Sequence, residues 1–93
     1  MEKQVRAHAV ISGRVQGVFF RVETQRAAEG FGVFGWVRNK RDGTVEAVIE
    51  GERQKVASML DWCREGPPRA VVNKVDVEWE KYIGEMVDFR VTH

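Results

Sequence analysis

The segment GRVQGVFFR, residues 13–21, separates a run typical of a strand from a run typical of a helix. Gly13 and Gly17 give it backbone freedom that other residues lack. It contains no proline, so every peptide N–H is available as a donor. A loop that leads into the amino end of a helix leaves N–H groups without intrahelical partners, which suits a phosphate-sized anion. Arg21 adds a planar guanidinium that matches phosphate oxygens in pairs.

The same segment is also compatible with an ordinary glycine-containing turn followed by a solvated arginine. Its spacing, GxxxG followed by FFR, fits neither the dinucleotide-binding fingerprint nor the Walker A motif. The segment therefore predicts an anion site only in combination with other residues that the fold brings to it.

The residues around this segment alternate between strand and helix patterns. Apolar residues recur at helical spacing in residues 20–31 and 52–65. Either Gly30 or Gly32 can end the first helix, and the run Gly66, Pro67, Pro68 ends the second. The sequence Asp42-Gly43 predicts a tight hairpin. Strand patterns are found in residues 5–12, 33–39, 44–50, 72–80 and 87–91.

Alternation within the strands predicts which side chains enter the core. In residues 44–50 we expect Val45, Ala47 and Ile49 to point inward and Glu46 and Glu50 to point outward. In residues 72–80, we expect an inward face made of Val75, Val77 and Trp79. The last strand is expected to contribute Val87, Phe89 and Val91.

The order of elements predicts an α+β fold, a ferredoxin-like βαββαβ sandwich with one mostly antiparallel sheet and two helices on one face. We expect residues 1–93 to form a single domain of this kind. In this architecture the first two strands run parallel with the third between them, about 9–10 Å apart. The segment 13–21 and Asn39 then lie at the same edge of the sheet, facing each other across an anion.

Asn39 is neutral and cannot act as a strong base, but its amide can hold a water molecule in one orientation. Its alternative role is that of a turn residue introducing the hairpin at Asp42. An anion site with N–H donors, one arginine and one amide has no nucleophile and no obvious acid. It suits a phosphate ester or anhydride whose leaving group needs no proton. Acyl phosphates fit this description, because a carboxyl pKa of about 4 makes the carboxylate stable at neutral pH.

The composition argues against several other classes of protein. A domain that binds nucleic acid is usually strongly basic, whereas the formal net charge here is +1, so we expect no nucleic-acid partner. No apolar run reaches the length of a membrane span, and we expect no membrane association. A single cysteine suits a reducing compartment, which favours the cytoplasm. His8 and His93 lie at opposite ends and no CxxC or HExxH motif occurs, so we expect neither a metal nor another cofactor.

Two competing signals point to other chemistry. Cys63 and Arg69 have the spacing of cysteine-dependent phosphatases, but Cys63 ends a predicted helix and two prolines remove needed N–H groups, so we interpret it as a core residue. The many aromatic residues raise the possibility of an RNA-binding sheet, yet the alternation of aromatic and basic residues that this requires is absent. Most of the aromatics are therefore assigned to the core, and His8 to a structural role.

With the loop and Asn39 both present, the chain resembles the acylphosphatase family over nearly its whole length. The segment SGRVQGVFFR, residues 12–21, is similar to the first signature of that family, and GWVRNKRDGTVEAVIEG, residues 35–51, to the second. GPPRAVVNKVDVEWE, residues 66–80, also resembles the family. The resemblance implies metal-independent hydrolysis of small-molecule acyl phosphates to a carboxylate and inorganic phosphate.

By this resemblance, Arg21 and Asn39 are the catalytic residues: Arg21 binds the phosphate by charge and Asn39 positions the attacking water. The residues expected to bind phosphate are those of the loop and the head of the helix, namely Val15, Gln16, Gly17, Val18, Phe19, Phe20 and Arg21. Phe19 stands at a position that varies in the family, so the resemblance assigns it no role; its place beside the loop makes it a candidate for contact with the acyl group. We expect a monomeric enzyme; the alternative is a binding module of the same fold that captures phosphorylated ligands without turnover.

Overall fold

The computed structural model describes residues 3–93 of the chain. Helix α1 has the predicted bounds, and the other elements begin and end within one or two residues of the prediction. The order along the chain is β1 (Gln4–Arg14), α1 (Phe20–Phe31), β2 (Phe34–Asn39), β3 (Val45–Glu52), α2 (Arg53–Glu65), β4 (Val71–Glu80) and β5 (Phe89–Val91).

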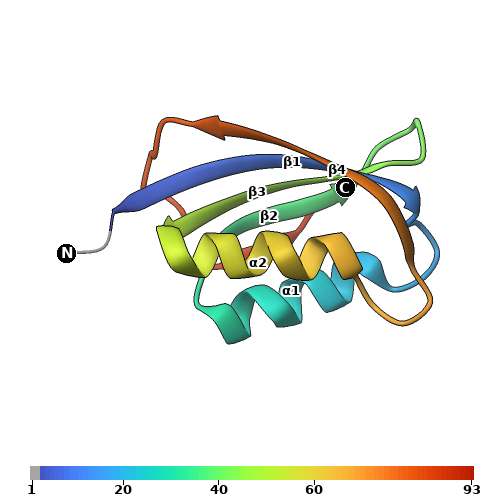
Figure 1. Ribbon diagram of the computed structural model, residues 1–93. Helices are drawn as coiled ribbons and strands as arrows, with labels where there is room; N and C mark the ends of the chain where they lie inside the picture. Colours follow the sequence, from blue (N-terminus) through green and yellow to red (C-terminus); the bar gives the residue numbers. More distant parts are fainter. Residues whose placement is uncertain (1–2) are drawn as a thin grey trace.

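The five strands form one sheet in the order β4-β1-β3-β2-β5. Both β1 and β2 pair antiparallel with β3, so they run parallel to each other with β3 between them, and only β2 and β5 are parallel neighbours. Helices α1 and α2 cover the same face of the sheet (Figure 1). The fold class predicted from the sequence is thus confirmed.

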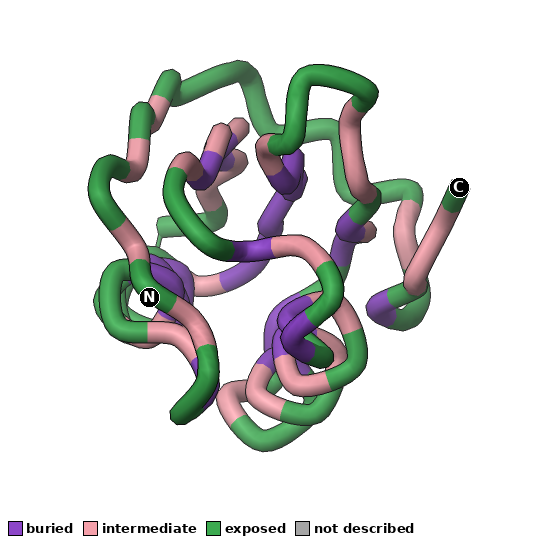
Figure 2. The backbone as a smooth tube through the Cα atoms, turned by 90° about the vertical axis from the view of Figure 1, so that its right-hand side faces the viewer, coloured by how far each residue is buried: buried purple, intermediate pink, exposed green. Residues whose placement is uncertain are grey.

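The core lies between the helices and the sheet, where buried positions gather (Figure 2). Alternate residues of β1 and β3 point into it, as the strand period requires: Ala7, Ala9 and Ile11, and Val45, Ala47 and Ile49. The helices contribute Phe20, Thr24 and Ala28 from α1 and Val56, Met59, Leu60 and Cys63 from α2. Phe20 lies with its ring centroid 5.8 Å from that of Trp62, so the first turn of α1 is fixed against α2.

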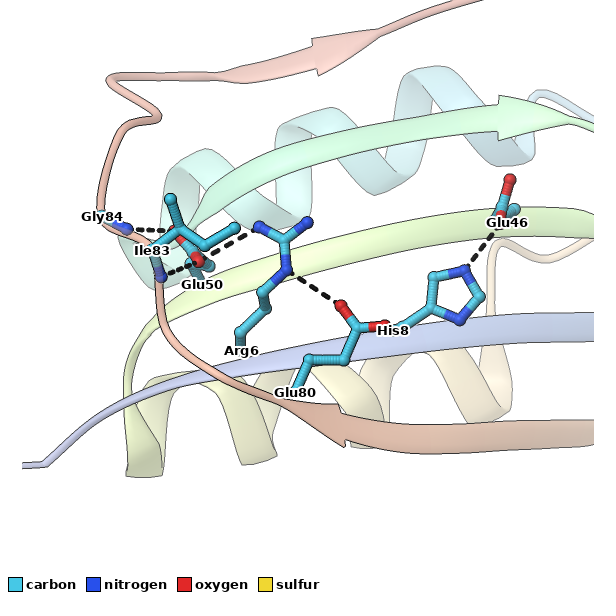
Figure 3. A network of polar contacts seen from close by, with 7 residues as sticks. All are labelled: Arg6, His8, Glu46, Glu50, Glu80, Ile83 and Gly84. Carbon is cyan, nitrogen blue, oxygen red and sulfur yellow. Dashed lines mark hydrogen bonds and ion pairs between the residues drawn. The ribbon is translucent and has the colours of Figure 1, made fainter.

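The outward face of β3 is covered by other parts of the chain, which the sequence did not predict. Glu46 and Glu50 point away from the helices but are only 9% and 1% exposed. Residues 81–88 run from β4 at one edge of the sheet to β5 at the other, and the N–H groups of Ile83 and Gly84 donate to the Glu50 carboxylate at 2.9 and 3.2 Å. Arg6 donates to the same carboxylate at 3.1 Å (Figure 3). Both glutamates thus point outward, as predicted, but neither is open to solvent: the crossing segment and Arg6 cover Glu50, and His8 and Arg38 bind Glu46.

Two predicted core residues are on the surface. Trp79 pairs with the buried Ala7 across the ladder, but it is 56% exposed because β4 is an edge strand. It lines a hollow of about 670 Å³ at the end of the sheet where β1 begins. Val87 is 79% exposed and precedes β5, which begins at Phe89. The alternation pattern fails at Trp79 because an edge strand has a neighbouring strand on one side only, and at Val87 because the strand begins two residues later, at Phe89.

Candidate active site

The loop between β1 and α1 has two residues in the left-handed conformation. Gly17 has φ 73°, and Phe19, which precedes the first residue of α1, has φ 63° and ψ 21°. A bulky residue in this region is uncommon, and such strain costs about 1–3 kcal/mol. The Phe19 side chain is also 68% exposed, so neither burial nor a side-chain cap of the helix explains it. Strained backbone of this kind gathers at functional sites.

Backbone donors are unused along this loop. Within residues 3–93, no N–H group of residues 16–22 donates a hydrogen bond to another backbone carbonyl, and the first such bond of the helix runs from Glu23 to the Phe19 carbonyl at 3.1 Å. These N–H groups carry the positive end of the helix dipole. The loop therefore has the donors that an oxyanion needs.

Beside the loop lies a hollow of about 260 Å³, which we call the anion hollow. It brings together Arg21 at the head of α1 and Asn39 at the end of β2. The remaining lining residues are Val15, Gly17, Phe19, Phe20 and Val22. A volume of this size can hold a phosphoryl group together with a water molecule, since one water molecule occupies about 30 Å³ in the liquid.

Two residues predicted to bind phosphate do not line the anion hollow. Val18 is 4% exposed and belongs to the core, as does Val15, so these two side chains anchor the loop to the core. The Gln16 side chain turns toward the hairpin instead, where it donates to two carbonyl groups. Only the backbone N–H groups of these two residues remain as possible ligands of an anion.

Asn39 lies on the helix-facing side of the sheet, in the same row as the buried Val37. It pairs with Val45, which in turn pairs with Ile11 near the end of β1. Among residues 3–93, its Oδ1 is buried and has no hydrogen-bond partner. A buried acceptor without a partner costs free energy, about 1–3 kcal/mol, and such a group is usually satisfied by a ligand or a water molecule.

The alternative role of Asn39, as a turn residue of the hairpin, is filled by other groups. The Lys40 N–H donates to the Thr44 carbonyl at 2.8 Å, and Thr44 donates from its N–H and hydroxyl to Asp42 at 3.0 and 2.6 Å. These two bonds from Thr44 lower the pKa of Asp42. The Asn39 side chain is thus free for the anion hollow.

Arg38, next to Asn39, points to the opposite face of the sheet. It donates to Glu46 at 2.6 Å and lies 5.4 Å from the ring centroid of Trp36. Arg21, by contrast, forms no ion pair with any acidic side chain or with the chain terminus within residues 3–93. Its charge is therefore available to a ligand.

The cysteine-dependent interpretation fails on burial. Cys63 lies on the core side of α2 with no exposed surface, and burial raises the pKa of its thiol to about 12. A thiol of this kind is protonated at neutral pH and is a poor nucleophile. In the described part of the chain, no three His, Cys, Asp or Glu side chains cluster as metal ligands, and no helix has the length and hydropathy needed to span a membrane.

Sequence reasoning missed two contributors to this region. Val22 lines the anion hollow and is 45% exposed. Its place directly after Arg21 at the head of the helix is the signal that would have found it. The contacts of the Gln16 side chain had no signal in the sequence, because they depend on how close the loop comes to the hairpin.

Comparisons with known proteins give a consistent result. The family model described as Acylphosphatase matches residues 7–91. An acylphosphatase of Pelotomaculum thermopropionicum is 52% identical over 88 residues, which cover 95% of this chain and 96% of the relative. The solved acylphosphatase of Coxiella burnetii is 40% identical with a TM-score of 0.90, over 96% of this chain and 93% of that one. For the Bacillus subtilis acylphosphatase the identity is 29% and the TM-score 0.92, over 96% and 99%.

Proposed function

The chain belongs to the acylphosphatase family and is an acylphosphatase, and we propose that the anion hollow is its active site. The observation that carries this proposal is the meeting of three groups in one place: loop N–H donors, Arg21, and the Asn39 oxygen; within residues 3–93, Arg21 has no ion-pair partner and the buried Asn39 oxygen has no hydrogen-bond partner. Its substrate is a small-molecule acyl phosphate.

The phosphoryl group is proposed to lie against the loop. The N–H groups of residues 16–22 and the guanidinium of Arg21 donate to its oxygens and oppose the charge that they carry in the transition state. These donors are fixed by the fold before the substrate arrives, because Val15 and Phe20 are buried on either side of the loop. Positive charge from Arg21 and the helix end makes a metal ion unnecessary for this step.

Asn39 is proposed to hold the attacking water. Its Oδ1 accepts a hydrogen bond from the water and directs a water lone pair at phosphorus, opposite the leaving carboxylate. The P–O bond to the carboxylate breaks as the bond to water forms: RCO–OPO₃²⁻ + H₂O gives RCOO⁻ + H₂PO₄⁻. The carboxylate leaves as a stable anion, so no general acid is required.

We further propose that the protein acts as a monomer in the cytoplasm. The proposed mechanism uses Arg21, Asn39 and loop N–H groups of a single chain and calls for no residue of a second copy. The single cysteine is a free, buried thiol, which suits a reducing compartment. Sedimentation at the concentrations used for kinetics tests the first statement, and cell fractionation tests the second.

The proposal is tested by following the ultraviolet absorbance of benzoyl phosphate during hydrolysis, with EDTA present, for the unaltered protein, Arg21→Ala and Asn39→Ala. We expect turnover that EDTA leaves unchanged and that each substitution lowers by at least about 100-fold. A folded protein that binds phosphate without turnover contradicts the proposal and favours a binding module. Turnover that neither substitution lowers moves the active site elsewhere.

A further inference from the structure

Gln16 joins the anion-binding loop to the hairpin that follows Asn39. Its side-chain Nε2 donates to the Lys40 carbonyl at 2.7 Å and to the Thr44 carbonyl at 2.9 Å, so both protons of the amide are used. Lys40 directly follows Asn39, and Thr44 directly precedes β3. One side chain thus spans the two sides of the anion hollow without lining it.

The position of this bridge matters because the sheet does not connect the two sides directly. Strands β1 and β2 are separated by β3, and the β1–β3 ladder ends at the pair Ile11 and Val45. Beyond that pair, residues 12–14 pair with β4, on the side away from β2, and within residues 3–93 the N–H groups of residues 16–22 donate to no other backbone carbonyl. A loop that keeps its backbone donors for a ligand cannot use them for its own support. Its support toward the hairpin therefore falls to a side chain.

We propose that Gln16 is a positioning residue, which sets the distance between the phosphate-binding N–H groups and the Asn39 amide. The proposal rests on the function proposed above for the loop and for Asn39. Attack on phosphorus in line with the leaving group depends on the placement of the water, and a displacement of about 1 Å can cost about 100-fold in rate. Groups that fix reactive residues in this way contribute to rate without touching the substrate.

The hairpin does not need Gln16 for its own hydrogen bonds. The Thr44 carbonyl also accepts from the Lys40 N–H at 2.8 Å, and the Lys40 carbonyl also accepts from the Gly43 N–H at 3.3 Å. Removing the Gln16 amide therefore leaves neither carbonyl without a donor. We expect the substituted protein to fold. The property that changes is the position of the loop relative to the hairpin.

Gln16→Met tests the proposal, because methionine keeps the length and volume of glutamine and removes both donors. Gln25→Met is the matched control: Gln25 also donates from Nε2 to a backbone carbonyl, that of Phe89 at 3.0 Å, but it does not line the anion hollow. For each variant we would measure kcat and KM with benzoyl phosphate, the inhibition constant of inorganic phosphate, and stability in urea.

For Gln16→Met we expect kcat to fall by at least about tenfold, while phosphate inhibition stays within about twofold. Gln25→Met is expected to keep kcat within about twofold at a similar loss of stability. A Gln16→Met protein with unchanged kcat overturns the proposal. So does an equal loss of kcat and phosphate affinity, since that outcome means a collapsed loop.

The double variant Gln16→Met/Asn39→Ala separates action through Asn39 from a direct effect. If Gln16 acts by placing Asn39, its substitution has no further effect on kcat once Asn39 is gone. Additive losses overturn the proposal. An unaltered protein without turnover is a different outcome, because it removes the proposed function itself, and with it the role of Gln16.

Discussion

His8 Nε2 lies 2.6 Å from Glu46 Oε2, on the face of the sheet that the helices leave open (Figure 3). Arg38 donates to the other oxygen of the same carboxylate at 2.6 Å. Burial raises the pKa of Glu46, but the hydrogen bonds from His8 and Arg38 lower it by more, and the net direction is downward. The ionised carboxylate is thus favoured in the folded protein.

The pKa of Glu46 is lower in the folded protein than in the unfolded chain. Its carboxylate therefore stabilises the fold at every pH at which the side chain is already ionised in the unfolded chain. This contribution is complete well above pH 4.5, the ordinary pKa of the side chain, and is lost as the pH falls through the lower folded pKa. We expect Glu46→Gln to lower the free energy of unfolding by about 1.5–3 kcal/mol at pH 7 and to flatten its acid dependence. Urea unfolding from pH 3 to pH 7 measures this, and parallel curves for the two proteins would contradict it.

Arg21→Ala is expected to lower kcat/KM by at least about 10³ and to remove inhibition by inorganic phosphate, because among residues 3–93 Arg21 is the one charged side chain that lines the anion hollow. Arg21→Lys keeps the charge without the planar fork and should recover only part of the loss. Arg26→Ala is the matched control, since Arg26 is on the same helix and pairs with Glu23 at 3.3 Å on the surface. An Arg21→Ala enzyme with unaltered phosphate inhibition refutes the assigned role.

Asn39→Ala should separate binding from turnover. Because the loop and Arg21 remain, we expect the inhibition constant of phosphate to stay within about threefold while kcat falls by about 10²–10³. Steady-state kinetics with phosphate as the inhibitor gives both quantities. Equal losses in the two would assign Asn39 to the structure of the hairpin instead.

The prediction of the fold depended on local patterns in the sequence. The helical spacing from Phe20 to Phe31 and the alternation from Val45 to Ile49 are set by the chain within a few residues, and both were confirmed. The meeting of Arg21 and Asn39 at one sheet edge followed from the strand order, which the element order implies.

Features that depend on distant segments were not predictable in this way. Glu50 is buried because residues 81–88 cross the sheet and donate to it, and no local pattern around Glu50 reports that crossing. Trp79 is exposed because its strand ended up at an edge. The Gln16 bridge depends on a contact between residues 24 and 28 positions apart, which only the folded chain brings together.

Phe19 is expected to influence which acyl group the enzyme prefers. Its exposed ring lines the anion hollow, beside Val22, and gives an apolar surface next to the phosphate position. Phe19→Ala should lower kcat/KM for benzoyl phosphate by about fivefold to tenfold, as expected for about 1 kcal/mol of lost apolar contact, and have a smaller effect on acetyl phosphate. Comparing the two substrates measures this, and equal effects on both would exclude contact with the acyl group.

Gly35 and Gly30 are predicted to respond to alanine in opposite directions. A Cβ on Gly35, at φ 148°, would lie 1.8 Å from the Val48 carbonyl oxygen, so Gly35→Ala should lower the free energy of unfolding by about 2–4 kcal/mol. A Cβ on Gly30 meets no atom within 4 Å, and Gly30→Ala should raise stability by about 0.5 kcal/mol. Urea unfolding of both variants tests the pair; a tolerated alanine at position 35 would show that β2 and β3 can separate locally.

Strand β3 lies between β1 and β2 in the sheet but follows both in the chain. During translation, Arg21 and Asn39 therefore emerge before the strand that spaces them. A nascent chain that ends at residue 44 carries every residue of the anion hollow and lacks the ladder to which both strands bond. Phosphate binding at the anion hollow, as proposed above, is therefore expected only after β3 has been synthesised, and a chain that ends at residue 44 is expected to bind no phosphate.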